Sequence, residues 1–141
     1  MSAQEERDFF WKCFDAYVDS QGNEFFTTHI KNGVNQAAGN INNSSAMAMQ
    51  TLCCEYKYLE QVVIVQVYIN QNERLFDYLY SKKEAIQREL GYEVEWVKSG
   101  KISSSVRRIQ KKFPINKPIY KMIEQIYPYI LDFIKVFEKY L

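Results

Sequence analysis

The chain has 141 residues, of which 47% are hydrophobic and 25% are charged, a composition typical of globular proteins. This composition excludes disorder of the whole chain, and the length predicts one hydrophobic core rather than two. Lys and Arg number 18 against 17 Asp and Glu, which gives a formal net charge of +1. No overall electrostatic field therefore draws the protein to nucleic acid or to anionic lipid, and any such binding has to be local.

The sequence contains no targeting or metal-binding signal. No segment approaches the ~20 apolar residues that cross a bilayer, and residues 1–6 lack the basic-then-apolar order of a signal peptide. We therefore predict a cytoplasmic protein that does not bind membranes. The cysteines form no CxxC pair and His29 is the only histidine, so we expect reduced thiols, no metal site and no cofactor.

The N-terminal third predicts a helix, a short strand and a loop. Ser2 and Glu5 have the spacing of a capping box, and apolar residues then recur at three- and four-residue steps, which predicts a helix over residues 5–19. Residues 24–30 are aromatic and rich in Thr, as in a strand. Residues 31–45 are rich in Asn, Gly, Ala and Ser. Because this composition buries too little apolar area to repay its ordering, we predict a loop there.

The middle of the chain predicts a hairpin, a helix and a second hairpin. Residues 46–58 and 62–69 have the pattern of antiparallel strands. The second is almost continuously β-branched, which predicts a central strand covered on both faces. Asn70 and Glu73 mark the start of a helix that Gly91 ends. Residues 93–96 alternate as a strand, Ser99-Gly100 predicts a turn, and residues 102–109 predict the returning strand.

The C-terminal segment predicts a long helix. Asn116 and Pro118 open it, and Pro128 inside it predicts a kink or a break near Tyr127. Apolar residues repeat at three- and four-residue steps. They cover a wider surface of the helix than the seam of a coiled coil, which needs two residues in every seven. Packing within the chain is one interpretation. The alternative is a homodimer through this helix that buries a second stripe of Tyr120, Tyr127 and Ile134.

Together these elements predict an α+β fold. Residues 1–141 are expected to form a single domain, with a mainly antiparallel sheet of four to five strands packed by three helices. The loop of residues 31–45 lies within this domain. The order of elements is helix, two or three strands, helix, two strands, helix.

Four groups of residues follow one another in a characteristic order. An aromatic first helix contains Phe9-Phe10-Trp11 and Phe14, and a later strand ends in Tyr68-Ile69. The next helix carries Leu75-Phe76, Leu79 and Lys82-Lys83-Glu84-Ala85-Ile86, and after Leu90-Gly91 a further strand ends in Glu95-Trp96. In these features the chain resembles an uncharacterised bacterial family, domain of unknown function 4268.

The resemblance implies a fold and a context rather than an activity. Domains of this family often lie C-terminal to nuclease-like modules in bacterial defence or restriction systems, and the resemblance supplies no catalytic residue for this chain. The family's central strand commonly carries Arg and Glu before its Tyr-Ile, whereas this chain has Ile64 and Gln66 at those positions. Any chemistry or ligand recognition that depends on those charges is therefore expected to be lost here.

A basic stretch without any acid is the strongest local signal for a binding site. It includes Ser103-Ser104-Ser105, which could donate to phosphates, and the cations Lys98, Lys101, Arg107, Arg108, Lys111 and Lys112. On a strand, Arg107 and Lys111 share one face and Arg108 and Lys112 the other, so half at most form one patch. One interpretation is a site for phosphate or an acidic partner. The other is a solvated edge strand whose lysines discourage aggregation.

Gln66, His29 and a pair of glutamates have both a functional and a structural interpretation. Gln66 is the lone polar side chain of an apolar strand, where it either bonds a core group such as a tyrosine hydroxyl or floors a ligand pocket. His29 could act as a general base, but no nucleophile is identifiable beside it, so a structural role is the alternative. Glu93 and Glu95 share a predicted strand face near Lys101, a faint likeness to a metal-dependent nuclease site that an exposed acidic strand also produces.

These observations favour a non-enzymatic binding or interaction domain that engages a nucleic-acid or protein partner. A role in bacterial or phage-linked defence is implied by the resemblance alone. One alternative is a metal-dependent enzyme, or enzyme subunit, acting on nucleic acid. Another is a small-molecule or nucleotide sensor in which loop 31–45 closes over an aromatic pocket, although that loop lacks the GxxxxGK[ST] and GxGxxG spacings.

Overall fold

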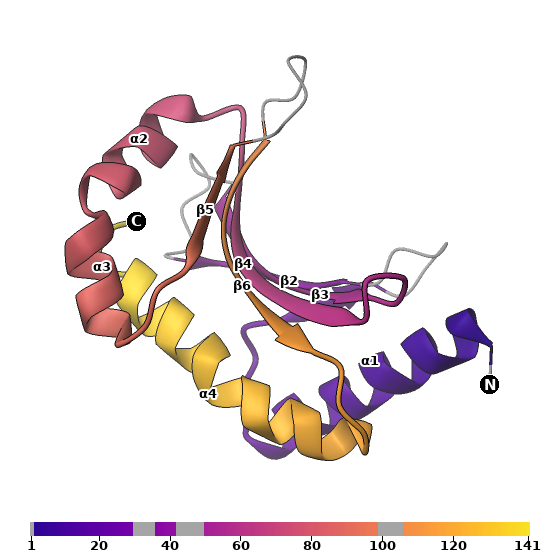
Figure 1. The fold of residues 1–141 in the computed structure, drawn as a ribbon. Coiled ribbons are helices and arrows are strands. Elements are labelled where there is room, and N and C mark those ends of the chain that lie inside the picture. The colour runs from indigo at the N-terminus through magenta and orange to yellow at the C-terminus, as the bar shows by residue number, and fades with distance from the viewer. Residues whose placement is uncertain (1, 30–35, 42–49, 99–105) are drawn as a thin grey trace.

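The strands of the chain join into one antiparallel sheet (Figure 1). The computed structural model describes residues 2–29, 36–41, 50–98 and 106–141. Within these residues six strands pair in the order β1-β2-β3-β4-β6-β5. The strands are β1 (Thr27–His29), β2 (Gln36–Asn40), β3 (Gln50–Lys57), β4 (Val62–Asn70), β5 (Glu95–Lys98) and β6 (Val106–Pro114). The helices are α1 (Ala3–Ser20), α2 (Glu73–Ser81), α3 (Lys83–Leu90) and α4 (Ile119–Phe137).

The predicted α+β fold with a mainly antiparallel sheet is confirmed. The described residues contain more elements than the sequence predicts. The sheet has six strands rather than four or five, because β2 forms where a loop is predicted. The helix predicted to run from Asn70 to Gly91 is divided at Lys82 into α2 and α3, with Asn72 as the N-cap and Gly91 in the left-handed conformation as the C-cap.

Strand β4 lies in the middle of the sheet and at the centre of the core. It pairs with β3 on one side and with β6 on the other, as its β-branched sequence predicts. Val63, Val65 and Val67 are all 0% exposed and belong to one cluster with apolar residues from every described helix. Burying each such side chain stabilises the fold by ~1.5–3 kcal/mol.

The helices cover one side of the sheet. Figure 1 shows a strongly curved sheet with α1, α2, α3 and α4 on its convex side, and no described helix on its concave side. Because side chains alternate along a strand, the residues between the core valines of β4 face the concave side. We call this side the uncovered face because no described helix lies on it, and at its centre are Ile64, Gln66, Tyr68, Glu95, Arg108, Gln110 and Lys112. Ile64 and Gln66 are nevertheless only 2% and 0% exposed, so β4 is buried on both faces, as its sequence predicts.

Helices α1 and α4 pack against each other, and the segment that follows α1 adds a polar contact to α4. Ser2 caps α1, since its Oγ accepts a hydrogen bond of 3.2 Å from the amide of Glu5, as the capping-box spacing predicts. In α4, Tyr127 is 7% exposed, and its hydroxyl accepts a 2.9 Å hydrogen bond from Asn23 Nδ2. Tyr17 packs edge-on against the same tyrosine, with ring centroids 5.2 Å apart.

The stripe predicted for a homodimer is largely used within the chain. Tyr127 is buried between α1 and α4, and Ile134 packs against the core cluster. Tyr120 remains on the surface at 54% exposure. The structure therefore gives the predicted homodimer no continuous apolar stripe.

Helix α4 continues through Pro128, where the sequence predicts a kink or a break. Proline removes one helical hydrogen bond and crowds the preceding turn. Ile126, Ile130 and Phe133 lie on both sides of it and are at most 4% exposed. Their burial holds the two halves of α4 against the sheet as one helix.

Strand β2 lies within residues 31–45, where the composition predicts a loop. Its backbone pairs with both β1 and β3, so it does not depend on large side chains. Ala37 is fully buried, and a Cβ at Gly39 would collide with the backbone oxygen and the ring of Phe25. The small residues that indicate a loop by composition instead allow close packing of backbone. The remainder of the predicted loop lies outside the described residues, apart from Ile41.

The bounds of the second hairpin differ from the predicted ones. Strand β5 covers residues 95–98 rather than 93–96, and β6 continues to residue 114, beyond the predicted end at 109. Residues 102–105 of the predicted strand lie outside the described residues. Gln87 of α3 accounts for part of the difference at β5. Its Oε1 accepts hydrogen bonds from the amide of Val94 at 3.0 Å and from the indole of Trp96 at 3.3 Å. The residues before Glu95 are thereby tied to α3 rather than to β6. The predicted turn at Ser99-Gly100 lies outside the described residues.

Gly39→Ala tests the close packing at β2. The added Cβ has no room beside Phe25, and overpacking of this kind costs ~1–3 kcal/mol. We expect the free energy of unfolding to fall by that amount in urea denaturation. Asn40→Ala, at the exposed end of the same strand, is the control and should change it by less than ~0.5 kcal/mol. Equal stability of the two variants would contradict the packing of β2 against Phe25.

Candidate functional site

Strand β6 divides the predicted basic site between two sides of the sheet. Arg108 and Lys112 are in register with Tyr68 and Ile64 and lie on the uncovered face. Arg107 and Lys111 are in register with Ile69 and Val65, which face the helices, and Lys98 is in register with Arg107. Lys101 and Ser103-Ser104-Ser105 lie outside the described residues. The described cations therefore do not gather in one patch.

Two buried carboxamides lie at the centre of the uncovered face. Gln66 of β4 and Gln110 of β6 are directly opposite each other in register and are 0% and 5% exposed. Gln110 Nε2 donates a hydrogen bond of 3.3 Å to Oε2 of Glu95, its register partner on β5. Gln66, Gln110 and Glu95 thus form a polar row across three neighbouring strands.

The hydrogen bonding of this row is incomplete. Neither Nε2 nor Oε1 of Gln66 has a partner in the described part of the chain, and Oε1 of Gln110 lacks one as well. The tyrosine hydroxyl predicted as a core partner for Gln66 is not found there. A buried polar group without a hydrogen bond costs ~1–3 kcal/mol. Within the described residues, nothing offsets this cost on the side of the sheet that no described helix covers.

Charges of both signs surround these carboxamides. The guanidinium of Arg108 lies over the ring of Tyr68, 5.7 Å from its centroid. Lys112 and Glu95 are exposed. Glu55 of β3, in register with Ile64, lies 3.7 Å from the ammonium of Lys57. The uncovered face is mixed in charge rather than basic.

Two of the cations on the helix-covered side, Lys111 and Arg107, are engaged within the chain. The ammonium of Lys111 lies over the rings of Tyr92, Phe113 and Tyr129, at 5.1, 5.7 and 5.8 Å from their centroids. Contacts of this kind are each worth ~0.5–1 kcal/mol at exposed sites and more where water is excluded. Arg107 lies 3.8 Å from the carboxylate of Glu73. These cations therefore contribute to packing on that side.

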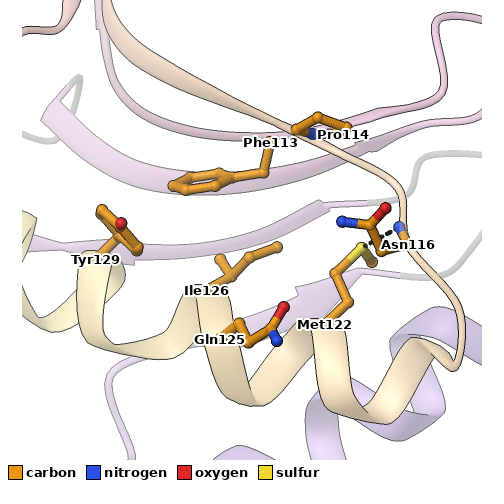
Figure 2. A pocket seen from close by; sticks show the side chains of 7 residues that line it. All are labelled: Phe113, Pro114, Asn116, Met122, Gln125, Ile126 and Tyr129. Carbon is orange, nitrogen blue, oxygen red and sulfur yellow. Dashed lines mark hydrogen bonds between the residues drawn. The ribbon is translucent and has the colours of Figure 1, made fainter.

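A small hollow opens beside this aromatic cluster, between the end of β6 and α4 (Figure 2). Its volume is about 240 Å³. Met122 and Ile126 form a buried apolar floor. The remaining lining residues are Phe113, Pro114, Asn116, Gln125 and Tyr129. The hollow thus has an apolar floor and a mixed rim that includes two carboxamides.

The residues considered for catalysis are not brought together. His29 lies in β1 and Glu95 in β5, the two opposite edges of the sheet, which are five strand spacings or roughly 24 Å apart along it at ~4.8 Å each. Glu93 is exposed and precedes β5, so the shared strand face predicted for Glu93 and Glu95 does not form. Among the residues that the structure describes, no group of three or more His, Cys, Asp or Glu could hold a metal ion.

Two tyrosines, the buried Tyr56 and the half-buried Tyr92, keep their hydroxyl protons rather than acting as bases. Burial raises the pKa of Tyr92 well above its usual range, and the carboxylate of Asp132 raises it further. Burial also raises the pKa of Tyr56, whose hydroxyl donates a 3.3 Å hydrogen bond to Oε1 of Glu6. Both hydroxyls stay protonated at neutral pH, so neither supplies a nucleophile or a general base.

Sequence reasoning misses Gln110 and Tyr68 as members of the uncovered face. Gln110 stands among cations in the sequence, and only the register of β6 against β4 places it opposite Gln66. The available signal is its spacing, because Arg108, Gln110 and Lys112 are two residues apart and share a strand face. Tyr68 is one of the residues that carry the family resemblance, at the end of a strand, and it is not among the predicted site residues.

Comparison with known proteins identifies a family and a fold. A family model described as "Domain of unknown function (DUF4268)" matches residues 6–141, and the chain belongs to this family. No curated protein matches the sequence. A solved structure, "Crystal Structure of the ExsC-ExsE Complex", contains a chain that is similar with a TM-score of 0.55 and 6% sequence identity. The similarity covers 99% of this chain and 96% of that chain. At this identity it concerns the fold alone.

No helix in the described residues is long and apolar enough to cross a membrane.

Gln66→Leu tests whether the buried carboxamide is unpaired. Replacing an unpaired amide with an apolar group of similar size removes its desolvation cost, so we expect the free energy of unfolding to rise by about 1 kcal/mol or to stay unchanged. Gln87→Leu is the contrast, because the Gln87 carbonyl accepts two hydrogen bonds, and it should lose ~1–3 kcal/mol. A similar loss in Gln66→Leu, measured by the same urea denaturation, would show that Gln66 has partners within the fold.

Proposed function

We propose that this member of the family is a non-enzymatic protein-interaction domain whose uncovered face binds a partner protein. The incomplete hydrogen bonding of Gln66 and Gln110 is the observation that carries the proposal. A carboxamide offers both a donor and an acceptor, the same pair that a peptide group presents. A partner whose peptide groups form hydrogen bonds with these carboxamides removes the cost of leaving them buried and unpaired, and this gain stabilises the complex.

Access to Gln66 requires a small rearrangement of its neighbours. Gln66 is 0% exposed in the free chain, whereas Tyr68 and Arg108 beside it are only half-buried. Because Tyr68 and Arg108 lie on the opposite face of the sheet from the buried valines of β4, a rotamer change at these side chains leaves the valines in place. Rotamer changes of this kind are common at protein interfaces, while the backbone moves little. The sheet thus provides a rigid support with adjustable side chains.

The mixed charge of the face favours a protein over a nucleic acid. A surface that binds nucleic acid concentrates Lys and Arg against the phosphates. Here Arg108 and Lys112 share the face with Glu55 and Glu95, and the other described cations of β6 lie on the helix-covered side. Protein interfaces accommodate both signs, because opposite charges across them set orientation and specificity.

The structural neighbour and the family context add weaker support. The similar chain comes from a complex of ExsC with ExsE, so the fold is compatible with a role in binding another protein. A place in bacterial or phage-linked defence, expected from the resemblance, and a cytoplasmic location, expected from the sequence, are kept as predictions. They direct the search for the partner toward proteins of that kind.

Site-specific photo-crosslinking in cells that express the chain tests this function. A photoreactive phenylalanine replaces Tyr68 on the uncovered face in one variant and Tyr120 on the exposed side of α4 in another, so that both substitutions start from tyrosine. Lys112 is a second position on the uncovered face. We expect one protein to crosslink from positions 68 and 112 but not from 120. Crosslinking mainly to nucleic acid, or the same products from all of these positions, would contradict the proposal.

A further inference from the structure

The hollow between β6 and α4 is separate from the uncovered face. Phe113, which forms one of its walls, shares a strand face with Lys111, and Lys111 is in register with the core residue Val65. Figure 2 shows the hollow framed by the end of β6 above and by α4 below. The hollow therefore belongs to the helix-covered side of the sheet, where the carboxamides of Gln66 and Gln110 do not reach.

The size of the hollow fits one apolar side chain. Its volume of about 240 Å³ is below the ~300–1,000 Å³ of most small-molecule sites. The floor residues Met122 and Ile126 are only 2% and 4% exposed, so the apolar surface removed from water on binding is mainly that of the entering side chain itself. Protein interfaces commonly place an anchor residue in a pocket of this kind.

The carboxamides beside the hollow are available to the backbone of such a segment. The side chains of Asn116 and Gln125 are exposed, and in the described part of the chain neither makes a hydrogen bond. The backbone amide of Asn116 is engaged separately, since it donates to Met122 Sδ at 3.2 Å (Figure 2). Each carboxamide can donate to a carbonyl and accept from an amide of a bound segment.

The charge around the hollow favours an acidic segment. On this side of β6 and at the start of α4 the cations are Arg107, Lys111, Lys117 and Lys121, against the acids Glu124 and Asp132 of α4. Arg107 and Lys117 form ion pairs with Glu73 and Glu6. In the described residues Lys111 forms none, and it lies over two rings that also line the hollow. Lys121 lies one helical turn before Gln125 on the same side of α4.

We propose that the hollow is an anchor site for one apolar side chain in an acidic segment of a partner protein. Phe113, Met122, Ile126 and Tyr129 contact the anchor, Asn116 and Gln125 bond the backbone beside it, and Lys111 and Lys121 attract the flanking carboxylates. This inference rests on the proposed function only in taking the partner to be a protein. It adds a second contact surface, on the opposite side of β6 from the uncovered face.

Titration with short peptides, followed by NMR of the ¹⁵N-labelled chain, tests the anchor site. The probes are capped seven-residue peptides with three acidic residues on each side of a central Leu, Phe or Gly, and a version of the Leu peptide with lysines in place of the acids. We expect the acidic Leu or Phe peptide to bind at least about tenfold more tightly than the Gly peptide, because burial of the side chain supplies the difference. Shifts should map to the hollow, and the lysine peptide should not bind.

Two tryptophan substitutions provide matched variants. Gln125→Trp fills the hollow from its rim and should weaken binding of the Leu peptide at least about tenfold. Glu124→Trp changes the preceding residue, whose side chain is rotated by ~100° around the helix and points away from the hollow, so it should not weaken binding. Both positions are exposed, so neither change disturbs the core. Arg108→Ala on the uncovered face should leave peptide binding unchanged.

Three results would overturn the inference: equal affinity for the Leu and Gly peptides, unchanged binding by Gln125→Trp, or no binding of any probe at millimolar concentration. Each of these rejects the anchor site alone if Tyr68 and Lys112 still crosslink to a protein. If crosslinking from the uncovered face fails while the acidic Leu peptide binds, the proposed role of that face falls and the anchor site remains.

Discussion

The alternation of side chains along β4 is the constraint on which this structure depends. Val63, Val65 and Val67 are buried against the helices on one side, and a strand that commits every second residue to a core has to present the others on its opposite side. On that side the same strand carries Ile64, Gln66 and Tyr68. The register with β6 then fixes which side chains meet them, so the position of the candidate site follows from the packing of the core.

The sequence predicts the parts of the fold that local pattern determines. Three features are predicted in this way: the β-branched run of β4, the serine cap of α1 and the glycine cap of α3. In each, the conformation that the residues prefer locally is the one that the folded chain requires. The two-residue repeat also predicts that Arg107 and Arg108 separate onto opposite sides of their strand. In these segments local propensity and packing agree, which is the condition under which a single sequence is informative.

The remaining features depend on contacts between distant residues. Strand β2 consists of residues that indicate a loop, and its pairing with two strands and its close approach to Phe25 override that composition. The start of β5 is set by the hydrogen bonds of Gln87. The register of β6 against β4 decides which residue lies opposite Gln66. A sequence supplies the alternation within each strand, but a one-residue slip in register would place every side chain of β6 on the other side.

We propose two different binding surfaces on β6, the uncovered face and the hollow, and neither role requires catalysis. Buried hydrogen-bonding groups that stay unpaired lower the stability of the fold. A bound partner that forms hydrogen bonds with them offsets this loss. This coupling of stability and binding is the central claim, and the affinity of Gln66→Leu for the protein that crosslinks at Tyr68 tests it most directly. Calorimetric titration should show binding weakened at least about tenfold relative to the unsubstituted chain, consistent with the ~1–3 kcal/mol of an unpaired buried group, while the variant is as stable as that chain or more so. Unchanged affinity, or a loss of affinity that accompanies a loss of stability, would contradict the account.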